Sequence, residues 1–405
     1  MLIFIGITTL TTMRLTTRII TLFGLFGWFT SSAQSGTVKG NNQFAMELYH
    51  KLTQNNSANF FMSPYSISSA LAMVHAGAKG NTAQELAQVL HFVPEKVNQD
   101  FRKLSKGFEA LSSSGIALKV ANALWAAKHT TFLPTYSQKI KQDYRARVTN
   151  LDFGQKPEAS RLKINQWVAD QTNHKIKDLL PAGFIDGSTT LVLTNAIYFK
   201  AEWLYKFDKA KTKKLSFTTR DQSLSGIPFM HTEQNFRYFE TESVQIVEIP
   251  YQDDKMSMVI WLPRPKYNLQ QVTEDLNADV IEDLDYRMAP TKVKFILPRF
   301  KMTIRTSLKQ PLTQLGLSSL FTSADFSGMS QAPLGSLSEV IHKAIIDVKE
   351  AGTEAAAATA GSVTRSVIST PKIFKADRPF FFVIREHQTG SILFMGKVEN
   401  PSIQK

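Results

Sequence analysis

Cysteine is absent from this sequence of 405 residues, and so are several familiar catalytic motifs. Without a thiol the chain has no disulfide, no cysteine ligand for a metal and no thiol nucleophile. The sequence also lacks the G-x-S-x-G, H-E-x-x-H, G-x-x-x-x-G-K-[ST] and G-x-G-x-x-G patterns of serine hydrolases, zinc proteases, P-loop proteins and dinucleotide-binding proteins. We therefore expect no metal site and no cofactor, and no local motif in the sequence predicts an enzyme.

Histidine is scarce, with eight residues spread along the chain. None of them forms a helical pair at metal-ligand spacing. His342 lies in the apolar stretch V-I-H-K-A-I-I, which favours a buried structural histidine over a catalytic one. A Ser/His/Asp site built from distant segments would leave no local motif, because such triads are recognised by geometry. A hydrolase therefore stays as a weak alternative.

The chain carries a formal charge of +13, which makes polyanions worth considering as partners. Its basic residues are dispersed, and the groups at Lys139 to Arg147 and Lys209 to Lys214 are predicted to be solvated faces rather than anion sites. Arg102, Lys103 and Lys106 add positive charge without forming a dense stripe. We expect weak polyanion binding at most, and no specific nucleic acid partner.

The N-terminal segment, residues 1 to 33, has the architecture of a signal peptide. Arg14 and Arg18 precede an apolar stretch at 19 to 29, and residues 31 to 33 read S-S-A, which suits cleavage after this point. The apolar stretch is too short to span a bilayer comfortably, so no membrane anchor is expected. We predict a secreted, extracellular protein, or a periplasmic one in a bacterial host.

Apolar periodicity in the rest of the chain predicts both helices and strands. Helices are expected at Ser66 to Ala76 and Ile164 to Thr172, and a capping box of Thr82 and Glu85 is expected to begin another. Strands are expected at Ala117 to Trp125, Leu191 to Phe199, Val244 to Tyr251, Met256 to Leu262, Lys292 to Leu297, Phe380 to Ile384 and Ser391 to Val398. No linker or repeat divides residues 34 to 405, so one α+β domain is predicted.

Four stretches, in order, resemble the serpin family. Residues 60 to 67 read F-F-M-S-P-Y-S-I, and residues 194 to 203 read T-N-A-I-Y-F-K-A-E-W. Near the C-terminus, residues 374 to 384 read F-K-A-D-R-P-F-F-F-V-I and residues 394 to 401 read F-M-G-K-V-E-N-P. The resemblance implies a single domain with three β-sheets, about nine helices and an exposed reactive-centre loop. It also implies a monomer that inhibits a serine protease as a suicide substrate.

The resemblance places the reactive-centre loop at about 350 to 372. Read alone, the run E-A-A-A-A-T-A from Glu354 predicts a short helix, because alanine is the best helix former. The family instead implies a hinge that inserts into the main sheet as a new strand after the loop is cleaved. The implied hinge residues are Glu350, Gly352, Thr353, Glu354, Ala355, Ala356, Ala357, Ala358 and Thr359.

Strand alternation divides this hinge into two faces. Thr353, Ala355, Ala357 and Thr359 share one face, and small side chains there suit entry into a buried sheet. Ala351 stands where many inhibitory relatives have a charged residue, but it adds no bulk on the inserting face. The resemblance therefore implies an inhibitor, and the alternative is a non-inhibitory serpin that acts as a carrier, chaperone or storage protein.

The reactive bond has two candidate registers, Arg365-Ser366 and Ser366-Val367. With Arg365 as the specificity residue the target is a trypsin-like protease, because a buried acidic group pairs with the guanidinium. With Ser366 it is elastase-like or subtilisin-like. Counting from the hinge favours Ser366, whereas the chemistry favours Arg365, to which we lean slightly.

Five further residues carry roles implied by the resemblance. They belong to the machinery that opens the main sheet rather than to catalysis. Ser63, Ser66, Asn195 and His342 are expected to form a hydrogen-bonded cluster beneath the point where the sheet parts, and Trp203 is expected near the point of first insertion.

Overall fold

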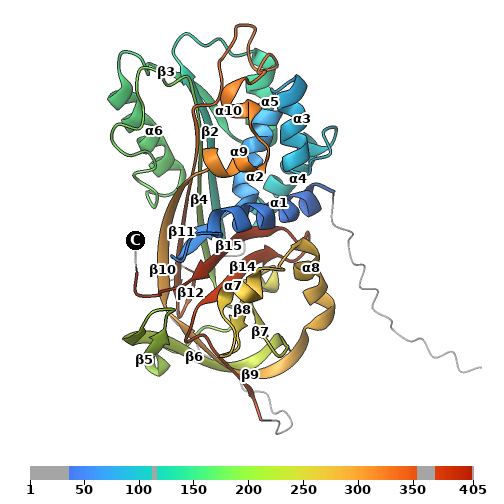
Figure 1. The fold of residues 1–405 in the computed structure, drawn as a ribbon, viewed down its shortest axis with the longest axis vertical. Helices are drawn as coiled ribbons and strands as arrows, with labels where there is room; N and C mark the ends of the chain where they lie inside the picture. The colour runs from blue at the N-terminus through green and yellow to red at the C-terminus, as the bar shows by residue number, and fades with distance from the viewer. Residues whose placement is uncertain (1–35, 112–115, 354–369, 404–405) are drawn as a thin grey trace, which may run out of the picture. The chain divides into compact units, whose positions relative to one another are not determined.

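Two hydrogen-bonded sheets form the framework of the fold, in a computed structural model that describes residues 36–111, 116–353 and 370–403. The chain divides into two units, Met1–Ala33 and Gln34–Lys405, and only the second contains described residues. Figure 1 shows helices around the upper part of this second unit and strands filling its lower part.

Ten α-helices lie in the described residues. Serine and asparagine side chains cap several of them: Ser63 accepts a hydrogen bond from the backbone of Ser66 ahead of Pro64, and Asn268 forms a capping box with Gln271. The helices are α1 (Gly36–Thr53), α2 (Pro64–His75), α3 (Gly80–Val89), α4 (Val97–Ala110), α5 (Pro134–Tyr144), α6 (Pro157–Gln171), α7 (Leu269–Thr273), α8 (Ala278–Arg287), α9 (Lys309–Leu315) and α10 (Ser319–Thr322).

The predicted capping box of Thr82 and Glu85 is wrong. Helix α3 begins two residues earlier, at Gly80, and its N-cap residue makes no side-chain cap hydrogen bond. Thr82 instead accepts a hydrogen bond from the backbone of Asp325 (3.0 Å), and Glu85 accepts one from the backbone of Ser319 (2.9 Å). These polar groups fasten α10 to α3, a tertiary role that a local motif does not reveal.

The six-stranded main sheet has the order β10-β11-β12-β4-β2-β3. Strand β4 is a buried run of apolar residues, as predicted for a strand covered on both faces. The strands are β2 (Ala117–Ala127), β3 (Arg147–Leu151), β4 (Leu191–Glu202), β10 (Phe300–Ser307), β11 (Glu339–Lys349) and β12 (Gly352–Thr353).

The other sheet has nine strands in the order β1-β15-β14-β8-β7-β6-β9-β13, with β5 paired to β6. Strand β6 pairs with β7 near one end and with β9 over much of its length, so it joins a central sheet to a small third sheet of β5, β6, β9 and β13. The strands are β1 (Phe60–Met62), β5 (Lys213–Thr218), β6 (Ser223–Glu240), β7 (Val244–Pro250), β8 (Met256–Pro263), β9 (Ala289–Pro298), β13 (Lys372–Lys375), β14 (Phe380–Glu386) and β15 (Ile392–Val398).

The predicted fold class is confirmed: α+β, one domain and three sheets, with ten helices in the described residues where about nine were expected. The seven predicted strands all exist, and most extend a few residues beyond their predicted ends. No helix in the described ranges is long and apolar enough to cross a membrane. In the same ranges, no cluster of three or more histidine, aspartate or glutamate side chains could hold a metal ion.

Candidate functional site

The main sheet is parted at one end by a strand of two residues. Strands β11 and β4 pair directly and in parallel over seven residue pairs, from Glu339 with Val192 to Ile345 with Tyr198. Beyond this point β12 lies between them. Thr353 pairs with Val348 on one side and with Ala201 on the other. We call the boundary between β11 and β4 the seam.

The conformation of Gly352 makes this entry into the seam possible. Its φ is 151°, and a Cβ atom at this position would lie 2.2 Å from the carbonyl oxygen of Ala201. No other residue type fits there, because real Cβ atoms do not approach a backbone oxygen so closely. Glycine is therefore required where the chain turns into the sheet.

The side chain of Thr353 is already buried on the inner face of the main sheet. It is fully buried, and its hydroxyl lies 2.8 Å from the hydroxyl of Tyr251. Trp203 stacks on the Tyr251 ring at 4.5 Å between ring centroids and donates a hydrogen bond to the carbonyl of Lys349 (2.9 Å). The two stacked aromatic rings thus pack beneath β12.

Glu350 anchors the turn that leads into β12. Its carboxylate accepts hydrogen bonds from Arg299 Nε (2.7 Å) and from the hydroxyl of Thr212 (2.6 Å). Burial by itself would raise the pKa of Glu350, but the hydrogen bonds from Arg299 and Thr212 outweigh it and lower the pKa. The carboxylate is therefore charged and held at the open end of the seam.

A buried polar cluster crosses the seam farther along the sheet. The structure brings together four residues named from the sequence: Ser63, Ser66, Asn195 and His342. His342 accepts a hydrogen bond from the backbone N–H of Ser63 at Nε2 (3.1 Å), so its Nδ1 carries the proton and donates to Asn195. Asn195 donates to the hydroxyl of Ser66 (2.5 Å). Trp203, the fifth named residue, lies apart from this cluster, beside β12.

Burial holds the His342 imidazole in its neutral form. The side chain is fully buried, and burial lowers its pKa from 6.5 to about 3. His342 and Asn195 are directly opposite each other on β11 and β4. Their hydrogen bond therefore bridges the two strands that a further inserted strand would have to separate.

Sequence reasoning missed Asn122, which extends this cluster onto a third strand. Asn122 lies opposite Asn195 in the β2–β4 pairing, accepts a hydrogen bond from it, and donates one to Ser69 (3.3 Å). The signal was present, since Asn122 is an isolated amide in the apolar strand A-L-K-V-A-N-A-L-W. A buried amide needs partners, and here they come from α2 and β4.

The remaining candidate residues lie outside the described residues. These are the hinge residues Glu354, Ala355, Ala356, Ala357, Ala358 and Thr359 and the reactive-bond residues Arg365, Ser366 and Val367. The structure therefore describes the chain up to Thr353 and again from Thr370, together with the sheet that flanks Thr353.

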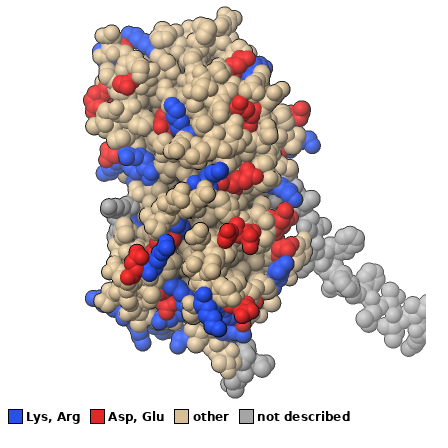
Figure 2. Space-filling view, viewed as in Figure 1, with Lys and Arg blue, Asp and Glu red and all other residues tan. Residues whose placement is uncertain are grey.

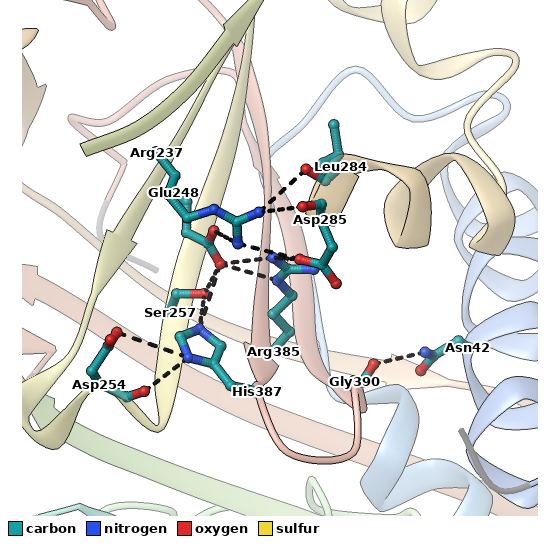
Figure 3. Close-up of polar contacts among 10 residues, drawn as sticks. All are labelled: Asn42, Arg237, Glu248, Asp254, Ser257, Leu284, Asp285, Arg385, His387 and Gly390. Carbon is teal, nitrogen blue, oxygen red and sulfur yellow. Dashed lines mark hydrogen bonds and ion pairs between the residues drawn. The ribbon is translucent and has the colours of Figure 1, made fainter. Parts of the chain in front are cut away.

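A buried charge cluster beneath β7, β8 and β14 brings a serine, a histidine and a carboxylate together (Figure 3). Ser257 donates to Glu248 (2.6 Å) and accepts a hydrogen bond from His387 (2.9 Å). Ser257 is fully buried, however, and Arg385 shares Glu248 (2.8 Å). A hydroxyl without access to solvent cannot attack a substrate, so this cluster is structural and gives no support to a hydrolase.

Ion pairing in this cluster determines its charge states. Burial would raise the pKa of Glu248, but His387 and Arg385 outweigh it and hold the pKa well below its usual range. Burial likewise opposes protonation of His387, but Glu248 outweighs it and raises the pKa of His387. Arg385 also donates a hydrogen bond to the carboxylate of Asp285 on α8 (2.7 Å).

Comparison with known proteins identifies the family. A family model described as "Serpin (serine protease inhibitor)" matches residues 39–401. Human leukocyte elastase inhibitor is 40% identical over 377 residues, covering 89% of this chain and 98% of that protein. The chain belongs to the serpin family.

Two solved structures of differently named proteins have the same fold as this chain. Native protease nexin-1 with heparin has a TM-score of 0.83 at 30% identity, covering 90% of this chain and 99% of that one. Human thyroxine-binding globulin, complexed with its ligand, has a TM-score of 0.82 at 28% identity, covering 91% and 99%. Serpins are protease inhibitors rather than catalytic enzymes, and the family also has non-inhibitory members.

Proposed function

We propose that this chain inhibits a serine protease by acting as a suicide substrate. The active-site serine of the protease attacks the carbonyl carbon of the reactive bond, the new amine leaves, and the serine stays joined to the loop as an ester. The hinge from Thr353 onward then inserts between β11 and β4 and carries the acylated protease with it. Deformation of the protease prevents water from completing the hydrolysis.

The observation that carries the proposal is the parted end of the seam. Gly352 and Thr353 already occupy the position of the first inserted residues, and Thr353 contacts Tyr251 inside the fold. Thr353 shares its strand face with Ala355, Ala357 and Thr359, by alternation. Each of these next inward-facing side chains is small, which lowers the steric barrier to further insertion.

The energetics favour insertion once the loop is cut. A new central strand adds roughly ten or more ladder hydrogen bonds at about 1 kcal/mol each, together with apolar burial. That gain is comparable to the whole stability of a typical domain, about 5–15 kcal/mol. The uncleaved chain is therefore metastable, and cleavage releases the difference to drive the trap.

The proposed target is a trypsin-like protease, with Arg365 as the specificity residue. The alternative register has Ser366 in that role and an elastase-like or subtilisin-like target, and human leukocyte elastase inhibitor is among the relatives. We also propose export, with cleavage after Ala33. N-terminal sequencing of protein secreted by the native host tests that site.

The decisive experiment is incubation with trypsin, elastase and subtilisin, followed by denaturing gel electrophoresis. A covalent complex of the chain with one of these proteases is expected. Mass spectrometry of the released C-terminal peptide then distinguishes Arg365-Ser366 from Ser366-Val367. Cleavage without a complex by every protease tried would overturn the proposed function.

A carrier is the second candidate, since thyroxine-binding globulin is among the solved relatives. The described residues enclose an open groove of about 1150 Å³ between α1, α7 and the start of β14. Its lining includes Lys51, Arg378, Lys397 and Glu399, so its chemistry suits a charged ligand better than an apolar one. Small-molecule binding by a chain that forms no protease complex would favour this alternative.

A further inference from the structure

Lysine side chains from three strands of the small third sheet, β5, β9 and β13, gather around His231 of β6. Lys375 on β13 and His231 on β6 both lie opposite Ile296 of β9, one on each side of it. Lys294 is two residues away on β9, and Lys213 of β5 pairs with β6 two residues before His231. We call these residues, together with Ile373, the basic face.

The charge of the basic face is largely uncompensated. Neither Lys213 nor Lys294 has a carboxylate partner within 4.0 Å in the described part of the chain, whereas Lys375 pairs with Asp377 (3.0 Å). The surplus of positive charge also acts on the pKa of His231. Burial is the largest cause that lowers this pKa, and the charges of Lys213, Lys294 and Lys375 lower it further. Its buried Nε2 also has no hydrogen-bond partner.

The basic face adjoins residues on both sides of the proposed reactive-centre loop. Thr212, the residue before Lys213, donates a hydrogen bond to Glu350 at the start of the hinge. Lys375 and Ile373 belong to β13, which begins two residues after Thr370, where the described part of the chain resumes. On the proposed function, a protease that engages the loop would come close to this face.

The composition of the face fits a protein surface better than a linear polyanion. Figure 2 shows lysine and arginine gathered at the lower end of the fold, with carboxylates interspersed among them. Glu233, opposite Lys294, pairs with Lys292 (3.1 Å), which interrupts any continuous positive stripe. Ile373 is 61% exposed and adds an apolar contact among the charges. Protein interfaces combine apolar contacts with charges of both signs, whereas a linear polyanion binds best to a continuous row of positive charges.

We propose that the basic face is an exosite that binds an acidic surface of the target protease and speeds the encounter of the protease with the loop. The proposal rests on the proposed function, whose chemistry it does not change. Complementary charge on two proteins mainly increases the rate constant of their association. Electrostatic steering of this kind raises on-rates by about 10-fold or more at low salt. The trapping step, which uses the seam, stays independent of the face.

The test compares two double variants that remove the same charge. K213Q/K294Q neutralises the basic face, and K103Q/K106Q neutralises two exposed lysines on α4 as a control. The protease that forms the covalent complex is used in its native form and after succinylation, which converts its surface lysines to carboxylates. The second-order rate constant of inhibition, the stoichiometry of inhibition and the thermal midpoint are measured at low salt and at about 0.5 M salt.

The unmodified chain and K103Q/K106Q are expected to inhibit the succinylated protease about tenfold faster than the native one at low salt. K213Q/K294Q is expected to lose most of this difference and keep its stoichiometry and thermal midpoint. Equal rates for all three chains would overturn the exosite while leaving the proposed function intact. Absence of any covalent complex would overturn both.

A soluble polyanion is the competing occupant. Heparin, which is present in the structure of a relative, serves as the probe. Heparin acceleration that K213Q/K294Q abolishes, with no dependence on the charge of the protease, would overturn the protease as occupant. Rates that follow the charge of the protease, without heparin, support the exosite.

Discussion

At the scale of single residues, two histidines have opposite charge preferences for physical reasons. His342 is fully buried among neutral partners, so burial lowers its pKa to about 3. His387 lies beside the buried carboxylate of Glu248, which raises its pKa despite burial. The position of each side chain relative to a carboxylate thus decides whether acid weakens or strengthens the fold.

The first prediction concerns the pH dependence that His342 causes. Its folded pKa lies below the unfolded value of 6.5, so the unfolded chain binds the extra proton and stability falls as pH falls below 6.5. At pH 5 the loss is about 2 kcal/mol, at about 1.4 kcal/mol per pH unit. His342→Gln should show a smaller drop in thermal midpoint between pH 7.5 and pH 5 than the parent chain.

His387 provides the control for that prediction. Because its folded pKa is raised, its contribution is fully present below 6.5 and is lost as pH rises through the folded pKa. His387→Gln should therefore destabilise more at pH 5.5 than at pH 9. Equal effects of both variants at every pH would contradict the assigned charge states.

The second prediction concerns Gly352, where a Cβ atom would meet the Ala201 carbonyl at 2.2 Å. Gly352→Ala should expel β12 from the seam, because the backbone of β4 cannot move aside cheaply. Trp203, which stacks beneath β12, should then show red-shifted fluorescence emission as water reaches it. Gly107→Ala, where no atom lies within 4 Å of the new Cβ, should leave the emission unchanged.

At the scale of elements, the seam combines an open end with a closed one. Thr353 enters between β11 and β4 at the open end, while the His342–Asn195 hydrogen bond ties the same two strands together farther along. On the proposed mechanism, insertion would break that bond, and the gain in ladder hydrogen bonds would offset its loss. Side-chain size at the inward positions of the hinge would then control how fast the seam opens.

The third prediction tests this control with Thr353→Arg. The side chain is fully buried against Tyr251, and an unpaired guanidinium there costs several kcal/mol. The variant should be cleaved as an ordinary substrate, with about tenfold less covalent complex on a denaturing gel. Thr313→Arg places the same change at an exposed helical position and should inhibit normally. Undiminished complex with Thr353→Arg would exclude insertion.

At the scale of the whole molecule, the proposed trap is a difference in stability between two folds of one chain. The uncleaved fold leaves most of the seam closed, whereas the cleaved chain can add a complete strand to the six-stranded sheet. A difference of roughly 10 kcal/mol would make the uncleaved fold metastable.

The fourth prediction follows from that difference. Cutting the loop with a protease that is not trapped should raise the thermal midpoint by roughly 10–15 °C, because an unfolding entropy of about 2.1 cal/mol/K per residue gives this chain about 1.3 °C per kcal/mol. Calorimetry of the uncleaved and cleaved chains measures the shift. A cleaved chain that melts at the same temperature as the uncleaved one would mean that the loop does not insert.

Much of the fold could be predicted from the sequence, because apolar periodicity is a local property. The strand from Leu191 and the helix from Ser66 follow directly from the runs that form them. The resemblance also named Ser63, Ser66, Asn195 and His342, which the structure brings into contact. The sequence by itself thus determined the fold class and the buried strands, whereas the chain positions of the loop stay a prediction.

Only the tertiary structure decided the partners, since hydrogen bonds and charge depend on segments far apart in the chain. Asn122 joined the cluster through β4, and Thr82 and Glu85 proved to fasten α10 rather than cap α3. Lys213 belonged to a basic group that was expected to be a solvated face, and Lys294 lies far from it in sequence, yet strand pairing brings both beside His231. The local sequence pattern determines where helices and strands form. Which polar groups meet is decided by the packing of those elements, because the partners of a side chain come from distant segments that the fold brings together.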